Sequence, residues 1–153
     1  MSTEADINYM QRALALALRA ADSGEVPVGA LIVRDGSIIA EGSNLVEKNF
    51  DPSAHAELLA IRAAGSVLQN WRLEGCTLYV SLEPCPMCGM AIRLARLSRV
   101  VYGTRDPRMG GHGSFLNLFS DSSIGPLPEV VGGILAEESS QMLKAFFRSR
   151  RTK

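Results

Sequence analysis

Hydrophobic residues recur at helical spacing in four segments of the chain. In the first, from about Ala5 to Ser23, apolar side chains every three or four positions predict one buried face, and Gly24 predicts the end of the helix. The second follows a loop that contains Pro52, and Ser53 is its predicted N-cap. The four predicted helices cover residues 5–23, 55–69, 85–97 and 136–151.

Strand patterns lie between these helices. Residues 28–42 contain two apolar runs around the pair Asp35-Gly36, which is typical of a hairpin turn. Further strands are predicted at residues 76–83, 99–106 and 129–135, and residues 107–114 are predicted to form a glycine-rich loop. A hairpin followed by strands that alternate with helices indicates an α/β fold, with a five-stranded mixed sheet covered by helices on both faces.

The composition indicates one soluble, globular domain that spans residues 1–153. Hydrophobic residues make up 46% of the chain and charged residues 21%, with sixteen basic and sixteen acidic side chains, which argues against disorder and against non-specific coating of nucleic acid. Basic residues do gather in the C-terminal segment RSRRTK. The N-terminal segment lacks the basic start of a secretory signal, and ALALAL is too short to cross a bilayer. We therefore expect a cytoplasmic protein with no membrane partner.

Two of the three cysteines, Cys85 and Cys88, stand three residues apart. They fall where a predicted strand ends and a helix begins, so both thiols face one side of the first helical turn, where the helix dipole favours the metal-binding thiolate. An odd number of cysteines does not indicate a disulfide framework, but C-x-x-C by itself also fits a redox pair or half of a structural zinc site. Cys76 opens a predicted strand and is expected to be a small core residue.

His55 and Glu57 favour a catalytic zinc site. His55 falls in the first turn of a predicted helix, so two helix N-termini can face one ion. Zn²⁺ accepts nitrogen and sulfur ligands, and three protein ligands leave a position for water, as in catalytic sites. Glu57 could take a proton from that water and return it to a leaving group. His112 lies in the glycine-rich loop, where a solvated or substrate-facing role is expected rather than a fourth ligand position.

The combination of H-x-E with P-C-x-x-C is the known signature of zinc-dependent nucleobase deaminases. In addition, EVPVGA, DPSAHAE, TLYVSLEPCPMC, RVVYGTRD and AFFRSRR occur in the order and approximate spacing of bacterial tRNA-specific adenosine deaminases, which the sequence resembles from its first helix to its C-terminus. That family converts the wobble adenosine of an anticodon to inosine. The resemblance implies a three-layer, cytidine-deaminase-like fold with one Zn²⁺ per subunit. It also implies a homodimer that binds the tRNA anticodon arm with the target base flipped out.

The resemblance also implies roles for individual residues. His55, Cys85 and Cys88 match the zinc ligands, and Glu57 matches the proton shuttle. The expected substrate-binding residues are Val28, Asn44, Ala56, Leu82, Asp106, Phe146, Phe147 and Arg148. Asn44 matches a residue that contacts the flipped nucleoside, and Val28 and Leu82 match the apolar walls of the base pocket. Asp106 matches a residue that contacts the RNA backbone. The last three positions contact the nucleotides that flank the target.

Two other functions remain open from the sequence. A deaminase of a free base or nucleoside, of the guanine, cytosine or adenosine type, would use the same ligands around a different pocket. A non-catalytic zinc-binding interaction domain would normally hold its metal with four protein ligands. Ammonia release from an anticodon stem-loop, compared with release from free adenosine, guanine and cytosine, separates these functions.

Overall fold

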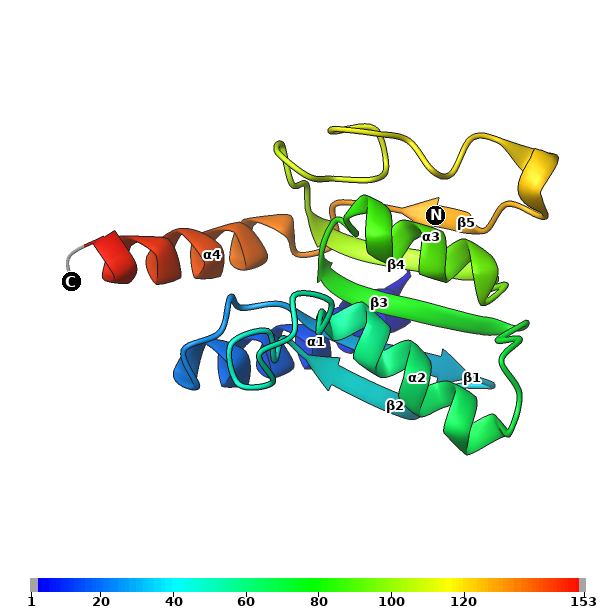
Figure 1. The fold of residues 1–153 in the computed structure, drawn as a ribbon, viewed down its shortest axis with the longest axis horizontal. Coiled ribbons are helices and arrows are strands. Elements are labelled where there is room, and N and C mark those ends of the chain that lie inside the picture. Colours follow the sequence, from blue (N-terminus) through cyan, green and yellow to red (C-terminus); the bar gives the residue numbers. More distant parts are fainter. Residues whose placement is uncertain (1–2, 152–153) are drawn as a thin grey trace.

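A computed structural model describes residues 3–151, so the first and last two residues of the predicted domain lie outside the described part. The order of elements along the chain agrees with the predicted one (Figure 1). The helices and strands are α1 (Glu4–Asp22), β1 (Gly29–Arg34), β2 (Ser37–Ser43), α2 (Ala56–Leu68), β3 (Cys76–Leu82), α3 (Pro86–Leu94), β4 (Arg99–Thr104), the short 3₁₀ helix η1 (Ser122–Ile124), β5 (Glu129–Val131) and α4 (Ala136–Arg151). In this described range no helix combines the length and apolar character needed to cross a membrane.

The five strands form one mixed sheet in the order β2-β1-β3-β4-β5. Strand β1 is antiparallel to both of its neighbours, whereas β3, β4 and β5 are parallel. It follows that β2 and β3 run in the same direction, although β1 separates them. The elements that follow β2 and β3 therefore leave the sheet at the same edge.

Helices cover both faces of the sheet, which confirms the predicted three-layer α/β fold. Helices α2 and α3 lie over one face and α1 lies over the other, whereas α4 contacts the sheet at its start and then extends past it (Figure 1). Strand β1 shows why two cores form, because its side chains alternate between the faces. Ala30 and Ile32 belong to the larger core under α2 and α3, and Leu31 and Val33 belong to the core under α1.

Two glycines allow helices to lie directly on the sheet. A Cβ atom at Gly42 would lie 2.4 Å from the carbonyl oxygen of Ala56, at the start of α2, and one at Gly29 would lie 2.1 Å from the carbonyl oxygen of Ala13 in α1. Real Cβ atoms do not approach backbone so closely, so any larger residue would push these helices away. Gly42 thus fixes how near the N-terminus of α2 comes to the sheet.

Two local expectations were wrong. Ser53 does not cap α2, because its N–H and hydroxyl both donate to the Asp51 carboxylate in the preceding turn, and His55 is the N-cap instead. The last strand stops at Val131 rather than continuing through 135. The strand ends there because Gly132 packs against the Tyr102 ring and Gly133 takes a left-handed conformation with φ of 89°.

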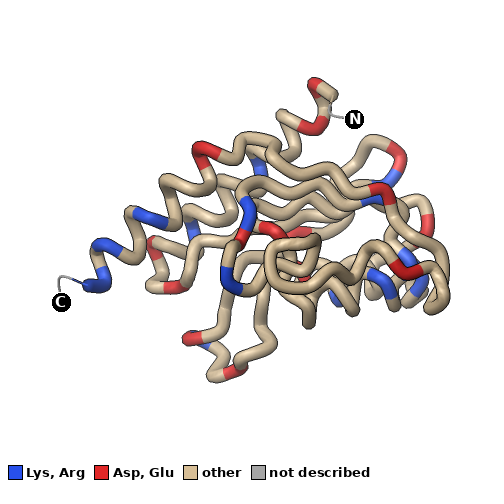
Figure 2. Tube along the Cα trace, turned by 90° about the horizontal axis from the view of Figure 1, so that it is seen from above, with Lys and Arg blue, Asp and Glu red and all other residues tan. Residues whose placement is uncertain are grey.

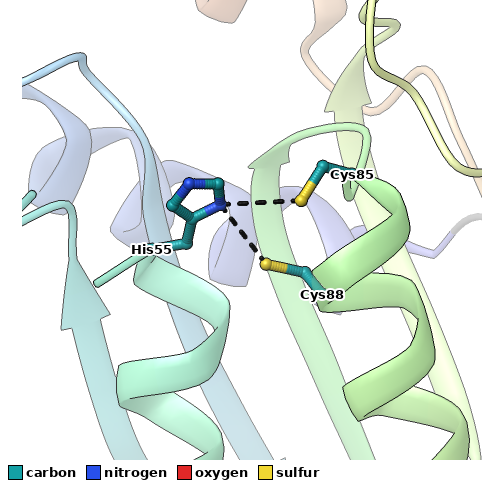
Figure 3. Close-up of side chains that lie close together, drawn as sticks. All are labelled: His55, Cys85 and Cys88. Atoms are coloured by element: carbon teal, nitrogen blue, oxygen red, sulfur yellow. Dashed lines mark hydrogen bonds between the residues drawn. The ribbon is translucent and has the colours of Figure 1, made fainter. Parts of the chain in front are cut away.

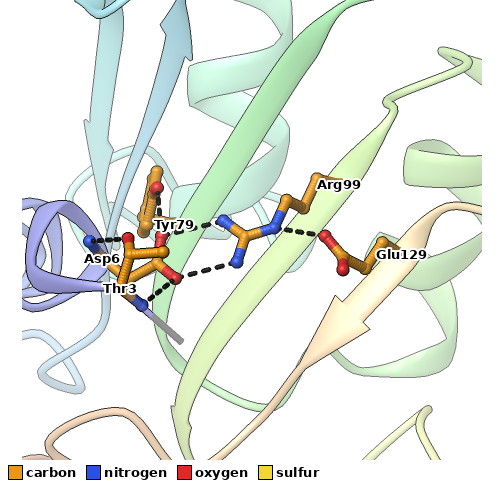
Figure 4. Close-up of polar contacts among 5 residues, drawn as sticks. All are labelled: Thr3, Asp6, Tyr79, Arg99 and Glu129. Atoms are coloured by element: carbon orange, nitrogen blue, oxygen red, sulfur yellow. Dashed lines mark hydrogen bonds and ion pairs between the residues drawn. The ribbon is translucent and has the colours of Figure 1, made fainter. Parts of the chain in front are cut away.

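A buried ion pair joins α1 to the sheet (Figure 4). Asp6 is 1% exposed and accepts two hydrogen bonds of 2.8 Å from the guanidinium of Arg99, and a third of 2.7 Å from the Tyr79 hydroxyl. The hydrogen bonds from Arg99 lower the pKa of Asp6 to about 2. Since this is below the ordinary value of about 4, the carboxylate stabilises the fold above pH ~4, and that contribution is lost as the pH falls toward 2.

We expect Asp6→Asn to lower the free energy of unfolding by about 2 kcal/mol at neutral pH, because the Arg99 guanidinium loses its buried charge partner and keeps only the ion pair with the more exposed Glu129. Urea denaturation measures the change, and the loss should shrink below pH 4. The matched control is Glu41→Gln, which breaks the more exposed pair with Arg12 and should cost less than about 1 kcal/mol. Equal losses in the two variants would contradict this account.

Candidate active site

Three potential metal ligands meet at the sheet edge where β2 and β3 end (Figure 3). His55 is the N-cap of α2, Cys85 is the N-cap of α3, and Cys88 lies in the first turn of α3 after Pro86. Proline suits this first helical position because it has no N–H group to leave unpaired. Among the described residues, neither N-cap side chain makes a capping hydrogen bond to its own helix, so both can turn toward a shared ion.

The spacing of these side chains fits a tetrahedral zinc site. Nδ1 of His55 lies 3.6 Å from Sγ of Cys85 and 3.5 Å from Sγ of Cys88, and all three ligand atoms lie within 4.8 Å of one another. Zinc bonds of about 2.0 Å to nitrogen and 2.3 Å to sulfur at tetrahedral angles put the nitrogen about 3.5 Å from each sulfur. The residues therefore fit the metal, and the three-ligand set is that of a catalytic zinc.

The two thiols respond differently to their shared surroundings. A hydrogen bond from Cys88 lowers the pKa of Cys85 to about 4, helped by His55. The same hydrogen bond, together with burial, raises the pKa of Cys88. The hydrogen bond between the two sulfurs therefore favours the thiolate at Cys85 and the thiol at Cys88, and a coordinating metal ion would favour the thiolate at both.

Glu57 lies in the first turn of α2, two residues after His55, on the wall of a cavity. Its side chain is 4% exposed, and burial raises its pKa to about 7. A divalent cation bound nearby favours the ionised carboxylate and opposes this effect. A buried carboxyl group with a pKa near neutrality can both accept and return a proton, which is the requirement for general acid-base catalysis.

The cavity in front of the ligands has a volume of about 950 Å³, at the upper end of the usual range for small-molecule sites. It brings together most of the substrate-binding residues expected from sequence. Those that line it are Val28, Asn44, Leu82, Asp106, Phe146 and Phe147, together with His55, Glu57 and Cys85. Ala56 is fully buried at the start of α2, and Arg148 is exposed on α4, so these two expected residues do not line the described cavity.

Several cavity residues escaped the sequence analysis. Glu25 is 1% exposed and accepts hydrogen bonds from the N–H groups of Glu47 at 3.0 Å and Lys48 at 2.8 Å, which holds the loop after β2. Glu83 is also 1% exposed and holds the loop after β4 in the same way. The sequence signal for both residues was an acidic side chain in a largely apolar segment, EVPVGA for Glu25 and VSLEPC for Glu83.

The remaining histidine and cysteine lie away from the ligands. The His112 ring is within 2.9 Å of the Tyr102 hydroxyl and packs edge-on against Tyr102 and Phe119, so it is a packed side chain rather than a solvated or cavity-lining one. Cys76 is fully buried at the start of β3, which confirms its expected place in the core.

Comparison with known proteins assigns the family. The sequence pattern of the cytidine and deoxycytidylate deaminase zinc-binding region matches residues 3–104, and the chain belongs to this family. A tRNA-specific adenosine deaminase of Bacillus subtilis (strain 168) is 48% identical over 145 residues, covering 95% of this chain and 90% of that protein. A tRNA-specific adenosine deaminase of Haemophilus influenzae is 47% identical over 150 residues, covering 97% of this chain and 87% of that protein.

Solved structures lead to the same class. A structure from work on A-to-I editing by tRNA:A34 deaminases at the wobble position matches with a TM-score of 0.86 and 41% identity, covering 89% of this chain and 99% of that one. A guanine deaminase from Bacillus subtilis matches with a TM-score of 0.63 and 47% identity, covering 69% of this chain and 66% of that one. With the ligand geometry above, these matches make the chain a zinc-dependent deaminase.

We expect Cys88→Ala to lose its zinc, because two protein ligands hold the ion far more weakly than three and the two helix ends are no longer tied together. Metal analysis of the purified protein should find less than about a tenth of the parent's zinc, and the melting temperature should fall. Cys76→Ala is the matched control, since it removes a buried thiol outside the ligand set and should keep its zinc. A fully zinc-loaded Cys88→Ala protein would exclude Cys88 as a ligand.

Proposed function

We propose that this chain hydrolyses the wobble adenosine of tRNA to inosine and releases ammonia. The observation that carries the proposal is similarity to tRNA-specific adenosine deaminases over nearly the whole chain, joined to a zinc-type ligand set beside a buried glutamate. The cavity supports it, because the C-terminal helix contributes the aromatic side chains of Phe146 and Phe147 to the cavity wall. We place the reaction in the cytoplasm, where tRNA is found.

The reaction replaces the amine on carbon 6 of adenine by the oxygen of water. His55, Cys85 and Cys88 would hold zinc, which would lower the pKa of a water molecule to about 7 and so supply a nucleophile at neutral pH. The Glu57 carboxylate takes a proton from this water and gives it to the adjacent ring nitrogen. Once the water oxygen has bonded to carbon 6, Glu57 moves the remaining proton of that hydroxyl group to the amine, so that the carbon–nitrogen bond breaks, ammonia leaves and a carbonyl group stays on carbon 6. Burial of Glu57 keeps bulk water from competing for the proton.

The walls of the cavity suit a flipped purine nucleoside. Val28 and Leu82 offer apolar surface to the faces of a base, while the amide of Asn44 can hydrogen-bond the base or sugar. Asp106 lines the cavity and is half-buried, and in this proposal it contacts the RNA backbone beside the target. Ala56 lies behind the wall and contributes through the position of α2.

The C-terminal helix supports contact with the neighbouring nucleotides. Phe146 and Phe147 line the cavity with rings 5.4 Å apart, and bases stack on such rings with little regard to sequence. Basic residues gather toward the C-terminal end of α4, where Arg148, Arg150 and Arg151 form the last turn (Figure 2). Arg150 is already engaged, because it donates to the carbonyl of Gly24 and lies over the Phe146 ring. Arg148 is exposed and available to a phosphate.

A homodimer forms part of the proposal. The outer surface of α2 and α3 exposes apolar side chains, among them Val67 at 58%, Met87 at 40% and Leu94 at 63%. Neighbouring exposed apolar side chains are typical of protein interfaces. A second copy of the chain on this surface would cover them, and sedimentation equilibrium would reveal a monomer if the proposal is wrong.

The competing function is deamination of a free base, and the match to a guanine deaminase is the observation that favours it. This match covers a smaller share of both chains than the match to the tRNA deaminase structure does. Deamination of tRNA therefore remains the first proposal. The test is to incubate zinc-loaded protein with an anticodon stem-loop that carries adenosine at the wobble position, and separately with free adenosine, guanine and cytosine. Inosine in the stem-loop is the expected result. Ammonia from a free base with none from the stem-loop would give the competing function first place.

In the same assay, Glu57→Gln should keep its zinc and lose turnover by a factor of about a hundred to ten thousand, because the amide keeps the shape of the side chain but cannot take a proton. Glu74→Gln, an identical change at an exposed position just before β3, is the matched control and should match the parent. Activity of Glu57→Gln within a factor of about three of the parent would remove Glu57 from the proton-transfer role.

The double variant Arg148→Ala/Arg151→Ala tests the RNA contact of α4. Each phosphate contact contributes about 0.7 to the slope of log affinity against log salt for single-stranded RNA, so the double variant should lose about 1.4 units of slope while zinc and melting temperature stay unchanged. Affinity for the stem-loop is measured across a salt series. Arg72→Ala, at an exposed position on the loop before β3, should leave the slope as it is. Coincident slopes for the double variant and the parent would show that α4 makes no phosphate contact.

A further inference from the structure

The segment that follows β4 walls the cavity with little regular secondary structure. Its residues Asp106, Met109, Phe115 and Leu116 all line the cavity, and we call residues 106–116 the substrate loop. Backbone outside a helix or a sheet ladder still needs hydrogen-bond partners if it is to keep one shape. The question is what holds this loop in place.

The carboxylate of Glu83 supplies those partners. It accepts hydrogen bonds from three backbone N–H groups of the substrate loop, at 3.0 Å from Asp106, 2.8 Å from His112 and 3.4 Å from Ser114. The Ser114 hydroxyl donates a fourth. Bonds to an ionised acceptor are about twice as strong as neutral ones, and these four are shielded from water because Glu83 is 1% exposed.

Two glycines let the substrate loop come this close. A Cβ atom at Gly110 would lie 2.2 Å from the carboxyl carbon of Glu83, and one at Gly111 would lie 2.9 Å from the carbonyl oxygen of Pro84. The N–H of Gly111 donates to that same carbonyl at 2.7 Å. Glycine is needed at both positions because it lets the loop rest on the short segment that ends at the zinc ligand Cys85.

We propose that Glu83 is a positioning residue that fixes the substrate loop relative to the metal ligands and thereby sets the affinity for substrate. The inference rests on the proposed function, since it requires substrate to enter this cavity. Glu83 stands two residues before Cys85. One short segment therefore carries both a metal ligand and the side chain that anchors the substrate loop. A shift of the anchor moves Asp106 and Met109 relative to the reacting centre.

Glu83 is not a second general base. Four donors already occupy its two oxygens, whereas Glu57 lies among the ligands with its carboxyl group on the cavity wall. Loss of Glu83 should therefore change where the wall stands and leave proton transfer intact. In kinetic terms the effect falls on KM and much less on kcat.

The test compares Glu83→Gln with the parent on the anticodon stem-loop. The amide keeps one acceptor oxygen and turns its NH₂ group toward loop donors, so about half of the anchoring hydrogen bonds are lost. We expect KM to rise on the order of tenfold, kcat per zinc-loaded site to stay within about threefold, and zinc content to match the parent. Amide hydrogen exchange at Asp106, His112 and Ser114 should become at least about tenfold faster. Glu74→Gln is the matched control and should show none of these changes.

Two further variants keep the test decisive if Glu83→Gln does not fold. Gly110→Ala displaces the carboxylate from the loop side, and Ser114→Ala removes a single donor, so both should raise KM, the second less than the first. Unchanged KM, or a fall in kcat per zinc-loaded site with KM unchanged, would overturn the inference. If the parent itself forms no inosine, the proposed function fails, and the amide exchange of the substrate loop still reports whether Glu83 holds it.

Discussion

The active site depends on one constraint, which is that two helices must begin at the same edge of the sheet. Strands β2 and β3 run in the same direction because β1 lies antiparallel between them, so α2 and α3 both start where the metal ligands are needed. Gly42 sets the depth of α2, and a proline begins α3. His55 and Cys85 occupy the N-cap positions, and neither makes a side-chain capping hydrogen bond there. The positive end of each helix dipole then stabilises the thiolates.

Buried charged side chains hold the irregular segments around the cavity. Glu25 and Glu83 each accept hydrogen bonds from backbone N–H groups of one loop. Arg93 acts with the opposite polarity, because its guanidinium donates to the carbonyl groups of Leu118, Asp121 and Gly125 at the far end of the segment after β4. A buried charge is costly unless such partners surround it, so each loop and its anchor stabilise each other. The loop portions of the cavity wall thus keep their shape without strand or helix hydrogen bonds of their own.

Stability and chemistry occupy different ends of the sheet. The ion pair between Asp6 and Arg99 lies at the start of β4 and joins α1 to the sheet, whereas the ligands and Glu57 lie beyond the end of β3. The chemistry needs a destabilising feature, a glutamate buried with its pKa raised. A well-packed sheet with a strong ionic link elsewhere allows that feature to persist.

The sequence by itself determined the fold class and predicted the cluster of His55, Cys85 and Cys88 with Glu57 beside it, because these depend on local pattern: the periodicity of strands and helices, and ligand types at fixed spacing beside helix starts. It also placed Cys76 in the core. Tertiary structure alone decided the rest. It made His55 rather than Ser53 the N-cap, packed His112 against Tyr102, and engaged Arg150 with Gly24. It also revealed Glu25 and Glu83 as anchors. The physical reason is that an N-cap hydrogen bond, a ring contact or a buried carboxylate depends on which distant backbone groups arrive beside it, and no spacing along the chain encodes that arrival.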